Sequence, residues 1–235
     1  MSSLFPFITL KSLNNGYTYH GKVKKFLQED YNEQLKRIDD SKINIIADYL
    51  NGVNIQNKLF DALNWSLYIN PIPDLEIYLL CAREDEKNEF SVVYGRNAKN
   101  IPTDDVYAFT LMYIITLAKI GDKTINFDKQ NFTKKFASIK PLLKSKYKAI
   151  IENYLNSVKL FNVPFLEKKF SKSTYFLVKN NTIFYRVFKD FIIKFNISDN
   201  IDISVTTDAI KTHGAKLVIT FIGLIINALK REMVK

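Results

Sequence analysis

The sequence is poor in the three residues that shape small secreted and all-β proteins: cysteine, glycine and proline. Among 235 residues there is a single cysteine, Cys81, so no disulfide forms within the chain. That composition favours a reducing compartment. Seven glycines and six prolines are few for the many tight turns of a sandwich or a barrel. This scarcity predicts a mainly α-helical fold.

Residues suited to metal or nucleophilic chemistry are also scarce. His20 and His213 lie far apart in the sequence, neither has a cysteine or a second histidine beside it, and there is no glycine-rich phosphate loop. Metal and phosphate sites need such clusters. We therefore predict no metal, no cofactor and no catalysis.

One spacing, however, resembles metal-dependent nucleases. Asp74 follows a proline, and Asp85, Glu86 and Lys87 come later in the segment "REDEKNE". Nucleases of that kind hold Mg²⁺ with carboxylates on a buried strand, with a lysine beside them. The charged segment has the pattern of an exposed turn, so we do not assign it a catalytic role.

No segment has the pattern of a signal peptide or the length of a membrane span. The start, "MSSLFPFITLKSLNNG", lacks a cationic beginning and a long apolar centre, which a signal peptide needs. The apolar run 217–229 has 13 residues, whereas a spanning helix needs about 20. We expect neither secretion by that route nor insertion into a bilayer.

Positive charge is concentrated in one third of the chain. The net charge is +10, and residues 119–194 hold 17 lysines or arginines against five acids, which leaves a net of −2 for the remainder. Such a region attracts a polyanion, either nucleic acid or an anionic membrane. The alternative is a solvated lysine-rich surface that reflects a lysine-biased coding sequence.

Apolar spacing predicts the secondary structure. Helices are expected at 19–37, 42–50, 55–63 and 106–120, with Asp104 and Asp105 capping the last of these. Strands are expected within 65–95, where the pattern alternates. Beyond residue 121 the pattern predicts mostly helices, with a hairpin or helix break at Asn180 and Asn181 and a final helix at 209–235. No tandem repeat is visible.

The predicted organisation has two helical lobes and two terminal segments. The N-terminal arm comprises residues 1–16 and the N-terminal lobe residues 17–121, with a small β-hairpin in that lobe. The basic C-terminal lobe comprises residues 122–207, and the C-terminal helix or arm residues 208–235.

Aromatic residues alternate with lysines in the basic third, as in "SKYKA", "FLEKKF" and "FYRVFK". Cations neutralise phosphates while aromatic rings stack on unpaired bases, which suits single-stranded nucleic acid. The competing interpretation assigns these aromatics to the core. The candidate binding residues in this region are Lys123, Lys129, Lys134, Lys135, Lys144, Lys146, Tyr147, Lys148, Lys168, Lys169, Lys179, Tyr185 and Arg186.

Two stretches carry a resemblance to a known family. "INIIADYLNGVNIQNKLFDALNWSLYIN" and "VYGRNAKNIPTDDVYAFTLMYIITLA" resemble nucleoproteins of the orthobunyavirus and tospovirus type across 43–120. In the first stretch the likeness lies at Gly52, Ile55, Leu59, Trp65 and Asn70. The resemblance implies a mainly helical, two-lobed nucleocapsid protein that holds single-stranded genomic RNA, without sequence specificity, in a basic groove between lobes.

The resemblance also implies a partner, a location and further site residues. The partner would be a viral polymerase, and the locations the virion and the host cytoplasm. Family members carry an arginine early in the central helix, where this chain has Thr110 or Leu111. Lys58, Arg96 and Lys99 are the nearest cations that could serve instead.

Both ends of the chain are apolar and must pack against something. In the family, terminal arms link subunits, which makes Leu4, Phe5, Phe7, Ile8, Phe221, Leu224 and Ile225 the candidate oligomerisation residues. Packing of the final helix within its own lobe is the alternative. A basic membrane-surface or matrix-like protein that binds anionic lipid is the alternative function.

Overall fold

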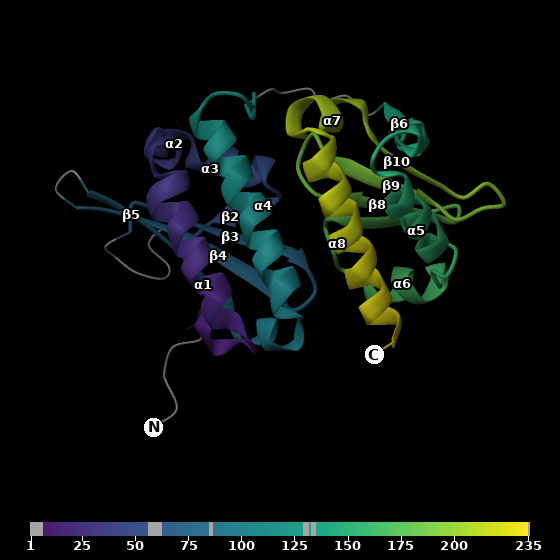
Figure 1. Cartoon of the computed structure of the whole chain (residues 1–235), viewed down its shortest axis with the longest axis horizontal. Helices are drawn as coiled ribbons and strands as arrows, with labels where there is room; N and C mark the ends of the chain where they lie inside the picture. Colours follow the sequence, from purple (N-terminus) through teal and green to yellow (C-terminus); the bar gives the residue numbers. More distant parts are fainter. Residues whose placement is uncertain (1–6, 56–62, 85–86, 129–131, 133–134, 235) are drawn as a thin grey trace. The chain divides into compact units, whose positions relative to one another are not determined.

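The computed structural model describes residues 7–55, 63–84, 87–128, 132 and 135–234. The chain forms two compact units, Met1–Lys129 and Gln130–Lys235, which we call unit 1 and unit 2 (Figure 1). Each unit contains one five-stranded antiparallel sheet with helices packed on it.

The sheet of unit 1 has the strand order β1-β5-β4-β3-β2. Its side chains alternate between a buried face and a partly exposed one, because successive residues of a strand point to opposite sides. Ile77 and Cys81 of β4 are fully buried, whereas Tyr78 between them is half-buried. The strands are β1 (Phe7–Ile8), β2 (Gly52–Asn54), β3 (Trp65–Ile72), β4 (Leu75–Glu84) and β5 (Lys87–Gly95).

The central helix of unit 1, α4 (Thr103–Gly121), packs on this sheet. Asp104 and Asp105 lie in its first turn and Lys119 in its last, where their charges oppose the helix dipole. Pro102 occupies the N-cap position and makes no side-chain cap hydrogen bond, so the two aspartates lie in the first turn, where they oppose the dipole as predicted, and not at the N-cap position. The other helices are η1 (Leu10–Ser12), α1 (Gly16–Lys25), the π-helix η2 (Phe26–Asp30), α2 (Asn32–Lys36), η3 (Asp40–Lys42), α3 (Ile43–Tyr49) and η4 (Arg96–Asn100).

The sheet of unit 2 has the order β6-β10-β9-β8-β7. The hairpin between β7 and β8 turns at Asn180 and Asn181, whose φ angles are 49° and 54°. Two consecutive residues with positive φ form the turn that matches the twist of a hairpin, so this hairpin prediction is confirmed. The strands are β6 (Phe136–Ser138), β7 (Phe176–Lys179), β8 (Thr182–Arg186), β9 (Ile192–Asn196) and β10 (Asp202–Thr206).

The helices of unit 2 cover one face of its sheet (Figure 1). They are η5 (Lys140–Lys144), α5 (Lys148–Val158), α6 (Val163–Lys169), α7 (Thr207–His213) and α8 (Ala215–Val234). The predicted final helix is therefore two helices, because Gly214 with φ 83° separates them. None of the helices described has both the length and the apolarity that crossing a bilayer requires.

The two units repeat one topology. In each, the first strand lies at the sheet edge and pairs with the last of four consecutive strands, and a long helix ends the unit. By strand order β1 corresponds to β6, β2 to β7, β3 to β8, β4 to β9 and β5 to β10. The sequence shows no matching repeat, because strand order is maintained by patterns of burial rather than by particular residues.

The prediction of a mainly α-helical protein was wrong, because the chain is a mixed α and β fold with two five-stranded sheets. Scarce glycine misled that prediction: Asp74, Asn180 and Asn181 take positive φ in the hairpin turns, a conformation that Asp and Asn tolerate. The strands predicted within 65–95 are confirmed as β3, β4 and β5. Most of the helix predicted at 55–63 lies outside the described residues.

Candidate nucleic-acid interface

The sheet of unit 2 has a buried inner face and an open outer face. Tyr185, Ile193 and Val205 lie side by side on the inner face and are at most 1% exposed. The residues next to them in each strand point the other way. Leu177, on this second face, is 61% exposed, so an outer surface of the sheet remains open to solvent.

Strand register aligns the side chains of this outer face in rows. Phe184 of β8 pairs with Leu177 of β7 on one side and with Lys194 of β9 on the other. In the next row Arg186 pairs with Ile192. We call the six side chains that carry the apolar and cationic character the unit 2 outer face: Phe136, Leu177, Phe184, Arg186, Ile192 and Lys194.

Aromatic rings and cations lie close together on the unit 2 outer face. The rings of Phe136 and Phe184 meet edge to face with centroids 5.9 Å apart. Lys194 Nζ lies 6.0 Å from the centre of the Phe136 ring, within the range of a cation–π contact. Two half-buried rings and a cation thus come from three different strands.

A shallow pocket opens beside these rings. Its volume is about 260 Å³, and its lining includes Phe136, Leu177, Phe184, Arg186 and Ile192. Pockets for drug-sized ligands start near 300 Å³, so this one suits a single flat ring. Arg186, one of these lining residues, is exposed.

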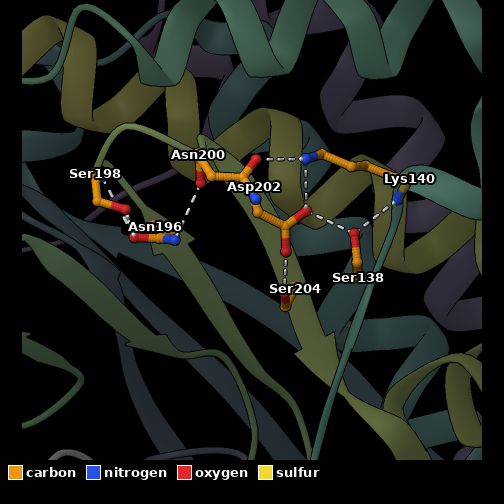
Figure 2. A network of polar contacts seen from close by, with 7 residues as sticks. All are labelled: Ser138, Lys140, Asn196, Ser198, Asn200, Asp202 and Ser204. Atoms are coloured by element: carbon orange, nitrogen blue, oxygen red, sulfur yellow. Dashed lines mark hydrogen bonds and ion pairs between the residues drawn. The ribbon is translucent and has the colours of Figure 1, made fainter.

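A polar network neutralises the acid at the edge of this surface (Figure 2). Asp202 of β10 accepts hydrogen bonds from Ser138 Oγ at 2.6 Å and from Ser204 Oγ. Lys140 Nζ lies 3.8 Å from the same carboxylate and donates to Asn200 Oδ1 at 3.3 Å. The carboxylate is therefore engaged within the unit, which weakens its repulsion of an anion on the neighbouring rows.

The charge of the whole unit has the same sign as the surface. Unit 2 holds 19 lysines or arginines and seven acids, a net of +12, while unit 1 holds 15 and 17, a net of −2. Such an excess produces a positive potential that falls off over roughly 8–10 Å at physiological salt. A potential of this sign favours association with a polyanion.

The predicted binding residues are scattered over both units. Arg186 belongs to the unit 2 outer face, and Lys179 lies on the same side of the sheet at the end of β7. An exposed lysine, Lys135, precedes Phe136. A second group lies at η5 and the start of α5, outside the sheet: Lys144, Lys146, Tyr147 and Lys148.

Other predicted cations lie apart from these two groups. Lys168 and Lys169 are at the end of α6, where Lys169 forms an ion pair with Glu232 at 3.4 Å. Arg96 and Lys99 are exposed on η4 and Lys123 follows α4, all three in unit 1. Three predicted residues lie outside the described part of the chain: Lys58, Lys129 and Lys134.

Tyr185, predicted to stack on bases, is only 1% exposed. It packs against Tyr175 on the inner side of the sheet, because in a strand the outward position belongs to its neighbour Phe184. The competing interpretation, which assigned these aromatics to the core, therefore describes Tyr185, since a shift of one position along a strand changes the face. Phe184 and Lys194 were missed, although the alternation in "TIFYR" and "IIKFN" could have indicated them. Phe136, in β6, was also missed.

The apolar ends of the chain pack within their own units. Phe7 of β1 contacts the Tyr78 ring at 4.8 Å, and Ile8 pairs with Tyr94. Phe221 meets Phe188 and Phe191 edge to face. Leu224 and Ile225 are also buried, so the alternative of packing inside the protein describes α8. Leu4 and Phe5 lie outside the described residues.

The nuclease-like spacing is only partly described. Among the described residues, no three His, Cys, Asp or Glu residues are arranged to hold a metal ion. Asp74 lies in the turn between β3 and β4, and Asp85 and Glu86 are not among the described residues. The thiol of Cys81 is buried, which raises its pKa to about 11 and so disfavours the thiolate form.

Comparison of the chain with protein-family models, with curated proteins and with solved structures finds no match. Arguments about function therefore depend on the surface chemistry of the two units.

Proposed function

We propose that the protein binds single-stranded nucleic acid, with no sequence preference, through the unit 2 outer face. The observation that carries the proposal is the placement of Phe136 and Phe184 beside Lys194 and Arg186 on an open sheet surface. Bases would stack on the two rings, and the backbone phosphates would lie against the cations.

The chemistry of this face favours single strands over a duplex. Stacking requires unpaired bases, and the shallow apolar pocket beside Phe184 accepts a flat ring. The two cations of the unit 2 outer face, Arg186 and Lys194, would contact backbone phosphates, which are identical along any sequence. The hydroxyls of Ser138 and Ser204 donate their protons to Asp202, so neither can donate a hydrogen bond to a base edge.

Encapsidation of a viral RNA genome, assembly into a ribonucleoprotein and contact with a viral polymerase remain predictions that depend on the resemblance to bunyaviral nucleoproteins. The helical fold implied by that resemblance is not the fold of this chain. Binding of a single strand by unit 2 depends on its own residues and is proposed independently of the resemblance.

The proposal is tested by fluorescence anisotropy with a labelled oligouridylate over a range of salt concentrations. Replacing Lys194 and Arg186 together with glutamate should weaken binding and lower the log–log salt slope by about 1.4, since each phosphate contact to a single strand contributes about 0.7. Phe184→Ala should weaken binding about tenfold at every salt concentration, because it removes a stacking surface.

A matched control reverses two exposed lysines of unit 2 that lie off the sheet, Lys172 and Lys230. This variant has the same net charge as the Lys194 and Arg186 variant, so a general loss of charge would weaken both equally. Equal weakening would remove the outer face as the site. The protein could instead float with anionic liposomes in a way that depends on Lys194 and fail to bind oligouridylate. That result would identify an anionic membrane, and not nucleic acid, as the ligand of the outer face.

A further inference from the structure

Unit 1 has an outer sheet face built on the same positions as the unit 2 outer face. Phe7 begins β1 opposite the last residue of β5, just as Phe136 begins β6 opposite the last residue of β10. Counting along the paired strands from this point places Tyr68 at the position of Phe184. Val53 takes the position of Leu177, and both are strongly exposed, at 53% and 61%.

Three positions differ between the two faces, and they change the sign of the charge. In unit 2 they hold Arg186, Ile192 and Lys194, and in unit 1 they hold Asn70, Glu76 and Tyr78. Two cations are therefore absent and one carboxylate is present. Phosphates would be repelled from the unit 1 face, so it does not duplicate the proposed nucleic-acid site.

The carboxylate of Glu76 is oriented by the two tyrosines beside it. Tyr68 OH lies 3.5 Å from one carboxylate oxygen, and Tyr78 OH lies 3.3 Å from the other and donates to it. The ring of Tyr78 also meets Phe7 edge to face at 4.8 Å and Tyr68 at 5.2 Å. We call these four side chains the unit 1 aromatic–acid cluster: Phe7, Tyr68, Glu76 and Tyr78.

We infer that the unit 1 aromatic–acid cluster is a docking surface for a lysine or arginine side chain on a basic segment of another protein. A carboxylate only accepts hydrogen bonds, so it is complementary to groups that only donate. Aromatic rings attract the same cations through their faces. The exposed Val53 beside the cluster provides apolar contact for the aliphatic stem of such a side chain.

Charge on the rest of this sheet face agrees with a cationic partner. The described side chains that point outward from it include a second acid, the exposed Glu89, and no lysine or arginine. A basic segment therefore meets no lysine or arginine among the described outward side chains of these strands. Complementarity of this kind raises association rates and excludes partners of the wrong charge.

The test is a titration of the full-length protein with hexa-arginine amide, followed by NMR of backbone amides. The expected shifts are centred on Val53, Tyr68 and Glu76 and weaken as salt is added, because exposed charge pairs are screened. Glu76→Gln should weaken binding about tenfold, since it removes a charged acceptor from the contact. Tyr78→Phe retains the ring but removes one hydroxyl that orients the carboxylate, and should weaken binding severalfold.

Asp30→Asn is the matched control, because it removes one exposed acid of unit 1 that lies in η2 and not on the sheet. Binding by this variant should be unchanged. Equal affinity of Glu76→Gln and Asp30→Asn, with Tyr78→Phe also unchanged, would overturn the inference. A concentration-dependent increase in mass that Glu76→Gln abolishes, in the absence of peptide, would also overturn it and identify a second copy of the chain as the occupant.

Discussion

Units 1 and 2 share a strand order but present surfaces of opposite charge. Tyr68 and Phe184 occupy one position and Val53 and Leu177 another, so the apolar parts of the two outer faces agree. The charged positions do not. If both proposals hold, the sheet is a common scaffold for rings, and a few outward side chains select the charge of the partner.

Ion pairing follows the same division. In unit 1, Arg37 pairs with Asp122 at 2.9 Å and Arg83 with Asp40 at 2.9 Å, and the unit as a whole has slightly more acids than cations. Unit 2 holds 19 cations and seven acids, a net charge of +12. This excess of positive charge favours an external anion over an external cation.

The largest expected effect tests whether the two units are independent folding bodies. Phe109 of α4 and Phe221 of α8 are both fully buried, and truncating a buried phenylalanine to alanine costs about 3–5 kcal/mol. If the units unfold separately, calorimetry shows two transitions. Phe109→Ala then lowers the midpoint temperature of one transition, and Phe221→Ala lowers the midpoint temperature of the other. Tyr17→Ala, at a residue 73% exposed, is the control and should shift neither. A single transition whose midpoint temperature falls in both variants would show that the two units do not unfold independently.

The next largest effect is expected from substitutions that give the unit 1 outer face the charged residues of the unit 2 outer face. Replacing Asn70 with Arg, Glu76 with Ile and Tyr78 with Lys gives unit 1 the charge pattern of the unit 2 outer face. The variant should bind a second oligouridylate, with a salt slope steeper by about 0.7 for each additional phosphate that it neutralises. The stoichiometry is measured by isothermal titration calorimetry. A stoichiometry that stays at the wild-type value in a folded variant would show that features other than these three residues define the site.

A smaller effect distinguishes the two faces by pH. Burial raises the pKa of Tyr78 to about 12, with the nearby Glu76 carboxylate as the next cause. The folded state therefore favours the neutral phenol. Its contribution to stability is complete below pH about 10 and is lost as the pH rises through about 12. Lys194 stands at this position in unit 2, so the part of the alkaline loss that comes from this position belongs to unit 1.

The measurement for this prediction is urea unfolding at alkaline pH, compared between the wild type and Tyr78→Phe. The variant should lose less stability than the wild type across this pH range, because it has no phenol to ionise there. Tyr147→Phe in unit 2 is the control. Identical pH dependence in all three proteins would remove Tyr78 as the source.

The secondary structure of unit 1 was predicted from the sequence more accurately than that of unit 2, for physical reasons. The strands within 65–95 alternate clearly, and the long apolar helix α4 was predicted within a few residues of its bounds. In unit 2 the lysines obscured the alternation: Lys194 lies between Ile193 and Phe195 on a strand whose neighbours along the chain resemble a basic helix. The candidate site depended on that alternation, so Arg186 was identified while Phe184 and Lys194 were not.

The smallest effect is expected at hairpin-turn positions where Asp or Asn, and not glycine, has a positive φ angle. Asp74 and Asn180 have φ angles of 66° and 49°, a region that costs a residue with a Cβ roughly 1–2 kcal/mol. Asp and Asn reduce that cost through local hydrogen bonds of their short polar side chains. Asn180→Ala should therefore lower the free energy of unfolding by about 1 kcal/mol, and Asp74→Ala should do the same in unit 1. Asn180→Gly should leave it within about 0.5 kcal/mol of the wild type, because glycine adopts positive φ without strain. Urea unfolding at neutral pH distinguishes these outcomes. Equal stability of the alanine and glycine variants would show that Asp and Asn are not needed at these positive-φ positions. The low glycine content would then need another explanation.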